Sequence, residues 1–196
     1  VSAHQKQFND DVELIIKQFK EFKKIKNAYA ETINKNTEIS NDTLVFSVTV
    51  PFRAEVFCKK ISEIFDKRSI KKCSWLDLSN FDVDIFMNED NLKEIIELTL
   101  SKKLKPTKGN FSESILRDIF SDWYNLAYNV TMDDDTIGSM SPGKKALVLL
   151  KLLINLDESK CPILIDQPED DLDNRSIYDE LIPFIRCKKI DRQIII

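Results

Sequence analysis

The sequence is short of glycine, histidine and long apolar runs, and each shortage excludes a class of protein. Its 196 residues contain three glycines and one histidine, where an average glycine content of about 7% would give roughly 14 glycines. So few glycines exclude collagen-like and low-complexity chains, and they argue against a complete glycine-rich nucleotide-binding fold within this chain. The single histidine, His4, excludes a histidine-based catalytic triad and an HExxH metal site.

Charge, hydropathy and cysteine spacing indicate a cytoplasmic globular protein. The chain has 29 basic and 33 acidic residues, and its net charge of −4 does not suggest a dedicated nucleic-acid-binding domain. No apolar run reaches the ~18 residues of a membrane-spanning helix, and the first residues lack the apolar core of a signal peptide. No CxxC pair occurs, so we expect no zinc site and reduced, mostly buried thiols at Cys58, Cys73, Cys161 and Cys187.

Residues 1–38 are predicted to form a long helix. Residues 4–36 contain no glycine or proline, and apolar side chains recur at alternating spacings of four and three, with a polar break at Lys26. The apolar positions are Phe8, Val12, Ile15, Phe19, Phe22, Tyr29 and Ile33. Two interpretations remain open, the end of a coiled-coil arm and an amphipathic helix packed on its own domain, because about four heptads are the minimum for a coiled coil.

Strand and helix patterns alternate along the rest of the chain. We expect a strand over 43–50, helices over 53–67, 91–104 and 112–124, a strand over 126–131 and a helix over 144–156. Two short apolar runs, 161–165 and 193–196, are typical of strands buried on both faces of a parallel sheet. Asn174 is expected to cap a helix between these two strands.

One segment matches the letters of a phosphate-binding P-loop but not its context. Gly138 to Lys144 fits GxxxxGK, yet a P-loop also needs a serine or threonine after the lysine and a buried strand before the loop. Here Lys145 follows the lysine in place of a serine or threonine, and the acidic turn 133–135 precedes the loop in place of a buried strand. These carboxylates would oppose the charge of a phosphate, so the P-loop interpretation is disfavoured.

The same segment has a second interpretation, as the start of a helix. Ser141 and the backbone of Gly143 lie at the predicted N-terminus, where N–H groups and the helix dipole favour a phosphate. Residues 140–147 (MSPGKKAL) resemble the signature motif of ABC-type ATPases, in the LSGGEKAL form of structural-maintenance-of-chromosomes (SMC) and related DNA-repair ATPases. In that family the motif acts on the γ-phosphate of ATP bound by the opposite protomer. An ordinary start, with Ser141 as cap and Pro142 first, explains the same residues.

A second resemblance to the same family follows along the chain, in the family's order and spacing. Residues 163–174 (ILIDQPEDDLDN) resemble the Walker B strand and D-loop of SMC-like ATPases in DNA repair and phage defence, written DQPEDNLDN. The resemblance implies that Asp166 organises Mg²⁺ and that Asp173 crosses a dimer interface. Gln167 stands where most ABC ATPases have the catalytic glutamate. Glutamine orients a water but cannot take its proton, so hydrolysis is slow or uses Glu169.

Together the two resemblances, which cover about residues 126–196, imply an α/β fold. It is the C-terminal lobe of an ABC-type P-loop ATPase head, mainly helical with a few mostly parallel buried strands, plus an N-terminal coiled-coil-like helix. Residues 1–38 would be the remnant of the arm and 39–125 the arm-proximal part of the lobe. The implied cofactors are ATP and Mg²⁺, with ATP contacts at Ser141, Gly143, Lys144 and Asp173.

The missing motifs imply a fragment that is inactive alone. No true Walker A occurs, and the final strand is where the family's switch histidine would follow. Implied partners are an N-terminal lobe of the same protein carrying Walker A, a second head in a homodimer, DNA, and a nuclease or other effector. Two alternatives stay open. One is a nucleotide-gated dimerisation module that barely hydrolyses ATP, and the other is a helical adaptor in which the motifs are coincidental.

Overall fold

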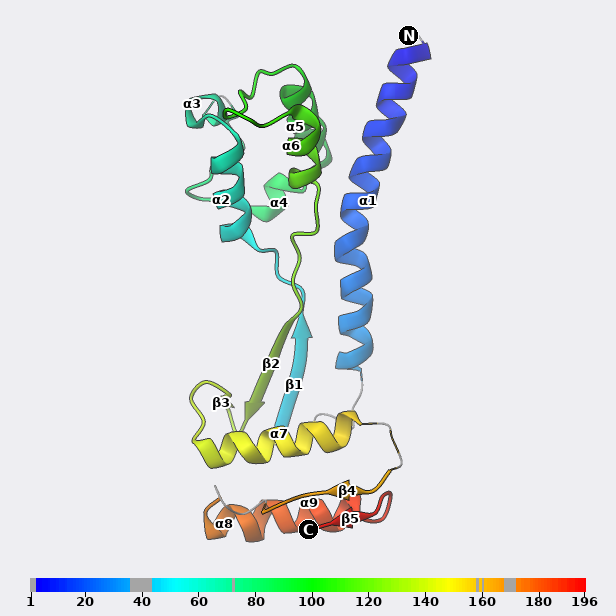
Figure 1. The fold of residues 1–196 in the computed structure, drawn as a ribbon, viewed down its shortest axis with the longest axis vertical. Helices are drawn as coiled ribbons and strands as arrows, with labels where there is room; N and C mark the ends of the chain where they lie inside the picture. The colour runs from blue at the N-terminus through cyan, green and yellow to red at the C-terminus, as the bar shows by residue number, and fades with distance from the viewer. Residues whose placement is uncertain (1–2, 36–43, 72, 158, 160, 168–171) are drawn as a thin grey trace. The chain divides into compact units, whose positions relative to one another are not determined.

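The chain forms two compact units, each with its own hydrophobic core (Figure 1). The computed structural model describes residues 3–35, 44–71, 73–157, 159, 161–167 and 172–196. Unit 1 comprises Val1–Tyr29 and Val50–Ala127, and unit 2 comprises Ala30–Thr49 and Tyr128–Ile196. The fold is mixed α/β and mostly helical, with small sheets.

The helices of unit 1 are α1 (Ala3–Asn34, which continues into unit 2), α2 (Ala54–Ile64), α3 (Lys67–Ile70), α4 (Val83–Phe86), α5 (Glu89–Leu100) and α6 (Ser112–Ile119). The remaining elements are β1 (Leu44–Thr49), β2 (Ala127–Met132), β3 (Asp135–Thr136), α7 (Pro142–Leu156), β4 (Ile163–Leu164), α8 (Asn174–Ser176), the π-helix η1 (Ile177–Leu181), α9 (Ile182–Lys188) and β5 (Ile194–Ile195). Each helix and strand expected from the sequence is present, with ends that differ from the expected ones by at most five residues. None of the helices in the described residues is long and apolar enough to cross a bilayer.

The long N-terminal helix is confirmed, and its apolar seam packs on unit 1. Val12, Ile16 and Phe19 are buried in the unit 1 core. The polar break in the seam has a partner, because the Lys26 ammonium lies 2.5 Å from the Asp122 carboxylate. Over this stretch the packing supports the second interpretation of the pattern, an amphipathic helix packed on its own domain.

The core of unit 1 is rich in aromatic side chains. Phe57 of α2 is fully buried, and its ring centroid lies 4.7 to 5.3 Å from those of Phe52, Phe81, Phe86 and Trp123. The rings meet edge-on or tilted, as the aromatic quadrupole favours. These contacts join α2 and α4 to the segments that flank them.

The larger sheet of unit 2 has the order β1-β2-β3 and is not parallel. β2 and β3 pair antiparallel, with Met132 opposite Asp135, and β1 and β2 run in opposite directions (Figure 1). Asp133 and Asp134 form the two-residue turn with φ of 50° and 66°, the signs that a type I′ hairpin requires. The prediction of mostly parallel strands is wrong here, because apolar content specifies a strand but not its direction.

The second sheet of unit 2 is parallel but is not buried as predicted. β4 pairs with β5, with Ile163 opposite Ile194 and Leu164 opposite Ile195. Leu164 is 76% exposed and Ile195 46% exposed, while Ile165 just beyond β4 is buried. An apolar strand is buried only where another layer covers it, and none of the described residues covers the outer face of this pair.

The four cysteines are free thiols, and the prediction that most are buried is wrong. Cys73 is buried, Cys58 is half-buried, and Cys161 and Cys187 are exposed. Burial raises the pKa of Cys73 to about 12, with a smaller contribution from the charge of Glu94. The spacing of the cysteines along the sequence does not indicate which of them are exposed to solvent.

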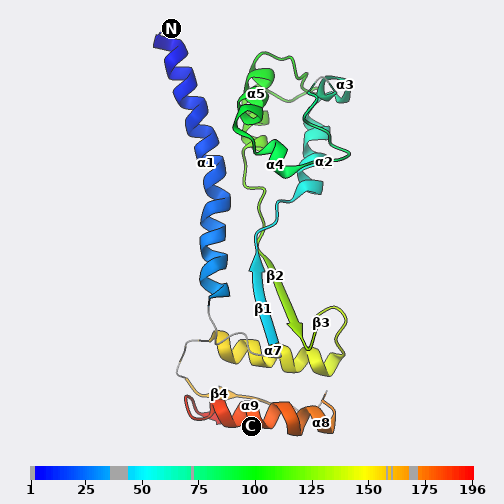
Figure 2. The same ribbon diagram turned by 180° about the vertical axis from the view of Figure 1, so that it is seen from behind.

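α7 and the helical segment 174–188 (α8, η1 and α9) position the candidate site. Leu147, Val148 and Leu152 of α7 are buried against residues of the larger sheet. Figures 1 and 2 show α7 and this segment side by side, running in the same direction, so that their N-terminal ends lie at the same side of unit 2.

Candidate functional site

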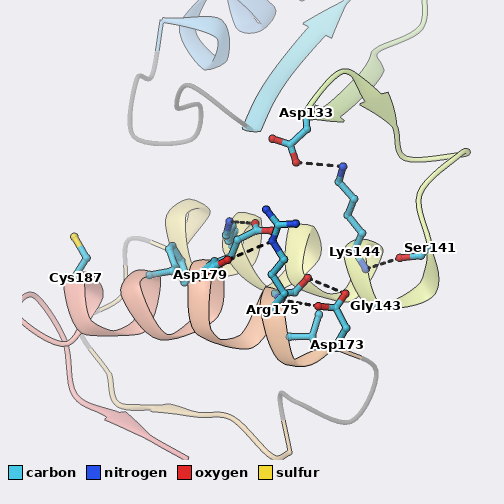
Figure 3. A pocket seen from close by; sticks show the side chains of 13 residues that line it. Asp133, Ser141, Gly143, Lys144, Asp173, Arg175, Asp179 and Cys187 are labelled. Atoms are coloured by element: carbon cyan, nitrogen blue, oxygen red, sulfur yellow. Dashed lines mark hydrogen bonds and ion pairs between the residues drawn. The ribbon is translucent and has the colours of Figure 1, made fainter.

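A cavity of about 770 Å³ lies along these two helical segments, from their N-terminal ends to Cys187 near the end of α9 (Figure 3). Its lining combines residues far apart in sequence, including the turn residue Asp133, the start of α7 and residues of the segment 174–188. The volume lies within the range of small-molecule sites. Four of the seven residues that the sequence singled out line it: Ser141, Gly143, Lys144 and Asp173.

The start of α7 lines the cavity with its serine cap and the buried Gly143. Ser141 is the N-cap, and its Oγ accepts the N–H of Lys144 at 3.2 Å. Pro142 has no N–H and suits the first helical position. Among the residues that the structure describes, no group accepts the N–H of Gly143. The segment before this start ends in the exposed two-residue strand β3, not the buried strand that a P-loop requires.

Lys144 is held by two carboxylates of the β2–β3 hairpin. Its Nζ lies 2.8 Å from Asp135 Oδ2. It also lies 3.2 Å from Asp133 Oδ2 (Figure 3). The hydrogen bond to Asp135 raises the pKa of Lys144 above its ordinary value, and Asp133 adds to this effect. Lys144 is therefore charged, but its charge is already balanced in this state.

Asp173 caps the second helical segment. Its carboxylate accepts the N–H of Ser176 at 2.8 Å and contacts the Ser176 hydroxyl at 3.2 Å. The bond from the Ser176 N–H lowers the pKa of Asp173 below its ordinary value. The expectation that Asn174 is the cap is wrong by one residue, because Asp173 has the extended backbone of a cap and Asn174 is already helical.

The sequence did not single out the ion pair that joins the two helical segments. Lys151 Nζ of α7 lies 3.0 Å from Glu180 Oε2 of η1, and the two side chains are 7% and 31% exposed. Both residues line the cavity. The one available signal was a lysine in the middle of an apolar helix, since a lysine at such a position is rarely buried without a partner.

Two further predicted residues, Asp166 and Gln167, do not line the cavity. Both follow β4 and are exposed. Gln167 has a φ of 45°, a left-handed conformation that costs a non-glycine residue roughly 1 kcal/mol or more. Glu169 lies outside the described residues.

Within the described part of the chain, no three His, Cys, Asp or Glu side chains form a group that could hold a metal ion. Asp166 therefore offers a single carboxylate. One carboxylate cannot hold a metal ion by itself. Mg²⁺, however, usually keeps several waters and binds through one or two carboxylates together with substrate phosphates.

Comparison with known proteins gives no relative. No protein-family model, no curated protein and no solved structure matches this chain.

Proposed function

We propose that the chain is the C-terminal lobe of an SMC-like ATPase head that binds ATP and Mg²⁺ across a head–head dimer. One observation carries the proposal. Two segments that resemble the signature motif and the D-loop, about 30 residues apart, place Ser141, Gly143, Lys144 and Asp173 in one cavity of about 770 Å³. If the two sequence matches were coincidental, there would be no reason for these four residues to line the same cavity.

Part of the lining of the cavity supports the phosphate end of a nucleotide. Its four carboxylates, Asp133, Asp173, Asp179 and Glu180, act against an anion unless a cation such as Mg²⁺ balances them. Two helix N-termini face the cavity from the same side, and such ends favour anions through open N–H groups and the helix dipole. The N–H of Gly143 and the Ser141 hydroxyl are donors, and Lys144 supplies a cation. Because Asp133 and Asp135 already balance Lys144, a phosphate competes with them for this ammonium.

Asp166 is the candidate Mg²⁺-organising carboxylate and Gln167 the candidate water-orienting residue. Bound Mg²⁺ would neutralise charge on the phosphates, and phosphoryl transfer depends mainly on such positioning and charge stabilisation. A glutamine cannot accept the proton of the attacking water. This favours a second candidate function, a nucleotide-gated dimerisation module with little hydrolysis.

Exposed apolar side chains of unit 2 support a further lobe that completes the head. Leu149, Leu153 and Leu156 are 47 to 67% exposed on α7, at helical spacings that place them along one face. The open face of the β4–β5 pair adds Leu164. We propose that the Walker A lobe of the same protein covers them, and that head closure acts on DNA and on a nuclease or other effector.

The test is ATP turnover by the full-length protein. We expect Asp166→Ala to abolish hydrolysis and Gln167→Glu to raise it. Wild-type turnover in Asp166→Ala would contradict both candidate functions. Absence of nucleotide-dependent dimerisation in the wild type would favour the helical adaptor instead. A coding sequence with a strand followed by GxxxxGK[ST] upstream of this segment is the matching genetic check.

Ser141→Asp separates binding from folding. Aspartate is as good a helix cap as serine, so the fold should persist, whereas its charge repels a phosphate at the same position. We expect Ser141→Asp to lose nucleotide-dependent dimerisation with little change in melting temperature. Ser141→Asn, which caps without charge, is the matched control and should retain dimerisation.

A further inference from the structure

Unit 1 carries a concentration of positive charge that the candidate site does not use. Residues 66–71 (DKRSIK), from α3 and its cap, and 101–111 (SKKLKPTKGNF), the loop between α5 and α6, contain seven cations and one carboxylate. The cations are Lys67, Arg68, Lys71, Lys102, Lys103, Lys105 and Lys108. In a chain with a net charge of −4, this is a strong local excess.

Hydrogen bonds between main chain and main chain, and between main chain and a side chain, hold the two basic segments together. The N–H of Asp66 donates to the carbonyl of Lys105 at 2.8 Å, and the N–H of Lys105 donates to Ser69 Oγ at 3.0 Å. A bridge between Phe65 and Pro106 continues this pairing. Figures 1 and 2 both show the loop passing beside α3. The seven cations therefore belong to one surface, which we call the basic surface.

The side chains of the basic surface are available to a ligand. All seven cations are exposed, and within the described part of the chain none of them forms an ion pair. Asp66, the one carboxylate in the two segments, accepts the N–H groups of Arg68 and Ser69 as the cap of α3. Like charges held together without a counterion repel one another, so an anionic ligand relieves a cost that the free protein bears.

We propose that the basic surface binds the phosphate backbone of a nucleic acid. Nucleic acid is the polyanion of highest charge density, with about one charge per 1.7 Å of duplex. Phe111, at the end of the loop, is 76% exposed, and an exposed aromatic ring beside cations suits a stacked base of a single strand. A bilayer is a weaker match because one exposed apolar side chain anchors a protein poorly.

The proposed binding rests on the DNA part of the proposed function but not on ATP. It uses unit 1 alone, whereas the nucleotide cavity lies in unit 2. Nucleic-acid binding in Ser141→Asp, measured without ATP, therefore separates the two proposals. The failure of one is therefore distinguishable from the failure of the other.

The test measures binding of the full chain to labelled oligonucleotides of about 30 nucleotides, single-stranded and duplex, over a range of salt concentrations. We expect affinity to fall steeply with salt. Replacing Lys103, Lys105 and Lys108 by glutamine should flatten the slope of log K against log salt by about 2 to 3, since each phosphate contact contributes roughly 0.7 to 0.9. Replacing Lys67, Arg68 and Lys71 should flatten it similarly, because both segments form one surface.

The matched control replaces Lys6, Lys17 and Lys59 by glutamine. These lysines of unit 1 are also exposed and lie outside the two segments, so the slope should not change. Phe111→Ala should weaken single-strand binding about five-fold or more and leave duplex binding unchanged. Equal losses in the cluster and control variants, or stronger binding to phosphatidylserine vesicles than to either oligonucleotide, would overturn the proposal.

Discussion

Single residues at the candidate site already have structural roles. Ser141 and Asp173 each cap a helical segment, and both line the candidate nucleotide cavity. Helix capping alone selects serine and aspartate at such positions. A loss of function in a variant that removes a cap is therefore ambiguous unless the replacement still caps the helix.

The capping role of Asp173 predicts a specific pH dependence of stability. Its pKa is lower in the folded protein than the value of about 3.9 for an unfolded chain. Its contribution is thus present above that value and is lost as the pH falls through the folded pKa. We expect wild type to lose melting temperature relative to Asp173→Asn between about pH 5 and pH 2, because asparagine caps without titrating.

The control for this pH effect is Asp191→Asn. Asp191 is an exposed carboxylate of unit 2 that caps no helix among the described elements. Its replacement should leave the pH profile parallel to that of wild type. A constant difference in melting temperature between wild type and Asp173→Asn over the whole range would contradict the capping role.

At the scale of elements, one buried ion pair fixes α7 against η1. Lys151 is almost fully enclosed, whereas the Glu180 carboxylate retains some contact with solvent. Glu180 also lies in a π-helix, a rare form that is frequent at functional sites. The pair holds together the two helical segments along which the cavity lies.

The unequal exposure of the pair predicts unequal costs of breaking it. Glu180→Leu leaves the enclosed Lys151 ammonium without a partner and should lower the free energy of unfolding by about 3 kcal/mol. Lys151→Met leaves only the more exposed Glu180 carboxylate unpaired and should lower it by about 1 to 2 kcal/mol. The double variant should lie within about 1 kcal/mol of wild type, because well-packed apolar residues replace a buried pair at little cost. Denaturation followed by far-UV circular dichroism measures each value.

An exposed pair on the same helical segment is the control. Arg175 and Asp179 lie 3.4 Å apart and are 90% and 65% exposed. Arg175→Gln or Asp179→Asn should change stability by less than about 0.5 kcal/mol. If Glu180→Leu and Lys151→Met lowered the free energy of unfolding equally, the solvent exposure of the unpaired charge would not determine the loss of stability.

Local sequence signals predicted the helices and strands, but they could not predict contacts between residues far apart in the sequence. The start of α7 followed from Ser141 and Pro142, whose preferences act within one turn. Asp173 and Asn174 cap equally well, so the sequence could not choose between them. The ion pairs of Lys144 and Lys151, and the pairing of Lys105 with α3, join residues whose distance in space no periodicity specifies.

At the scale of the whole molecule, the two units have cores of unequal size. The described core of unit 1 contains 18 buried hydrophobic residues, and that of unit 2 contains eight. Because buried apolar area is the main source of folding free energy, unit 1 should be the more stable of the two. Both tryptophans of the chain, Trp75 and Trp123, belong to unit 1.

This distribution predicts two separate unfolding transitions. In a urea titration, circular dichroism should lose part of its helical signal before tryptophan fluorescence changes, because fluorescence reports unit 1 alone. Leu147→Ala in α7, where the side chain is 1% exposed, should shift only the first transition, with a cost of about 2 to 5 kcal/mol. Phe57→Leu in unit 1 should shift only the second. Coincident transitions by both probes, or a fluorescence shift caused by Leu147→Ala, would instead establish one cooperative unit, since coincidence of probes is the test of two-state unfolding.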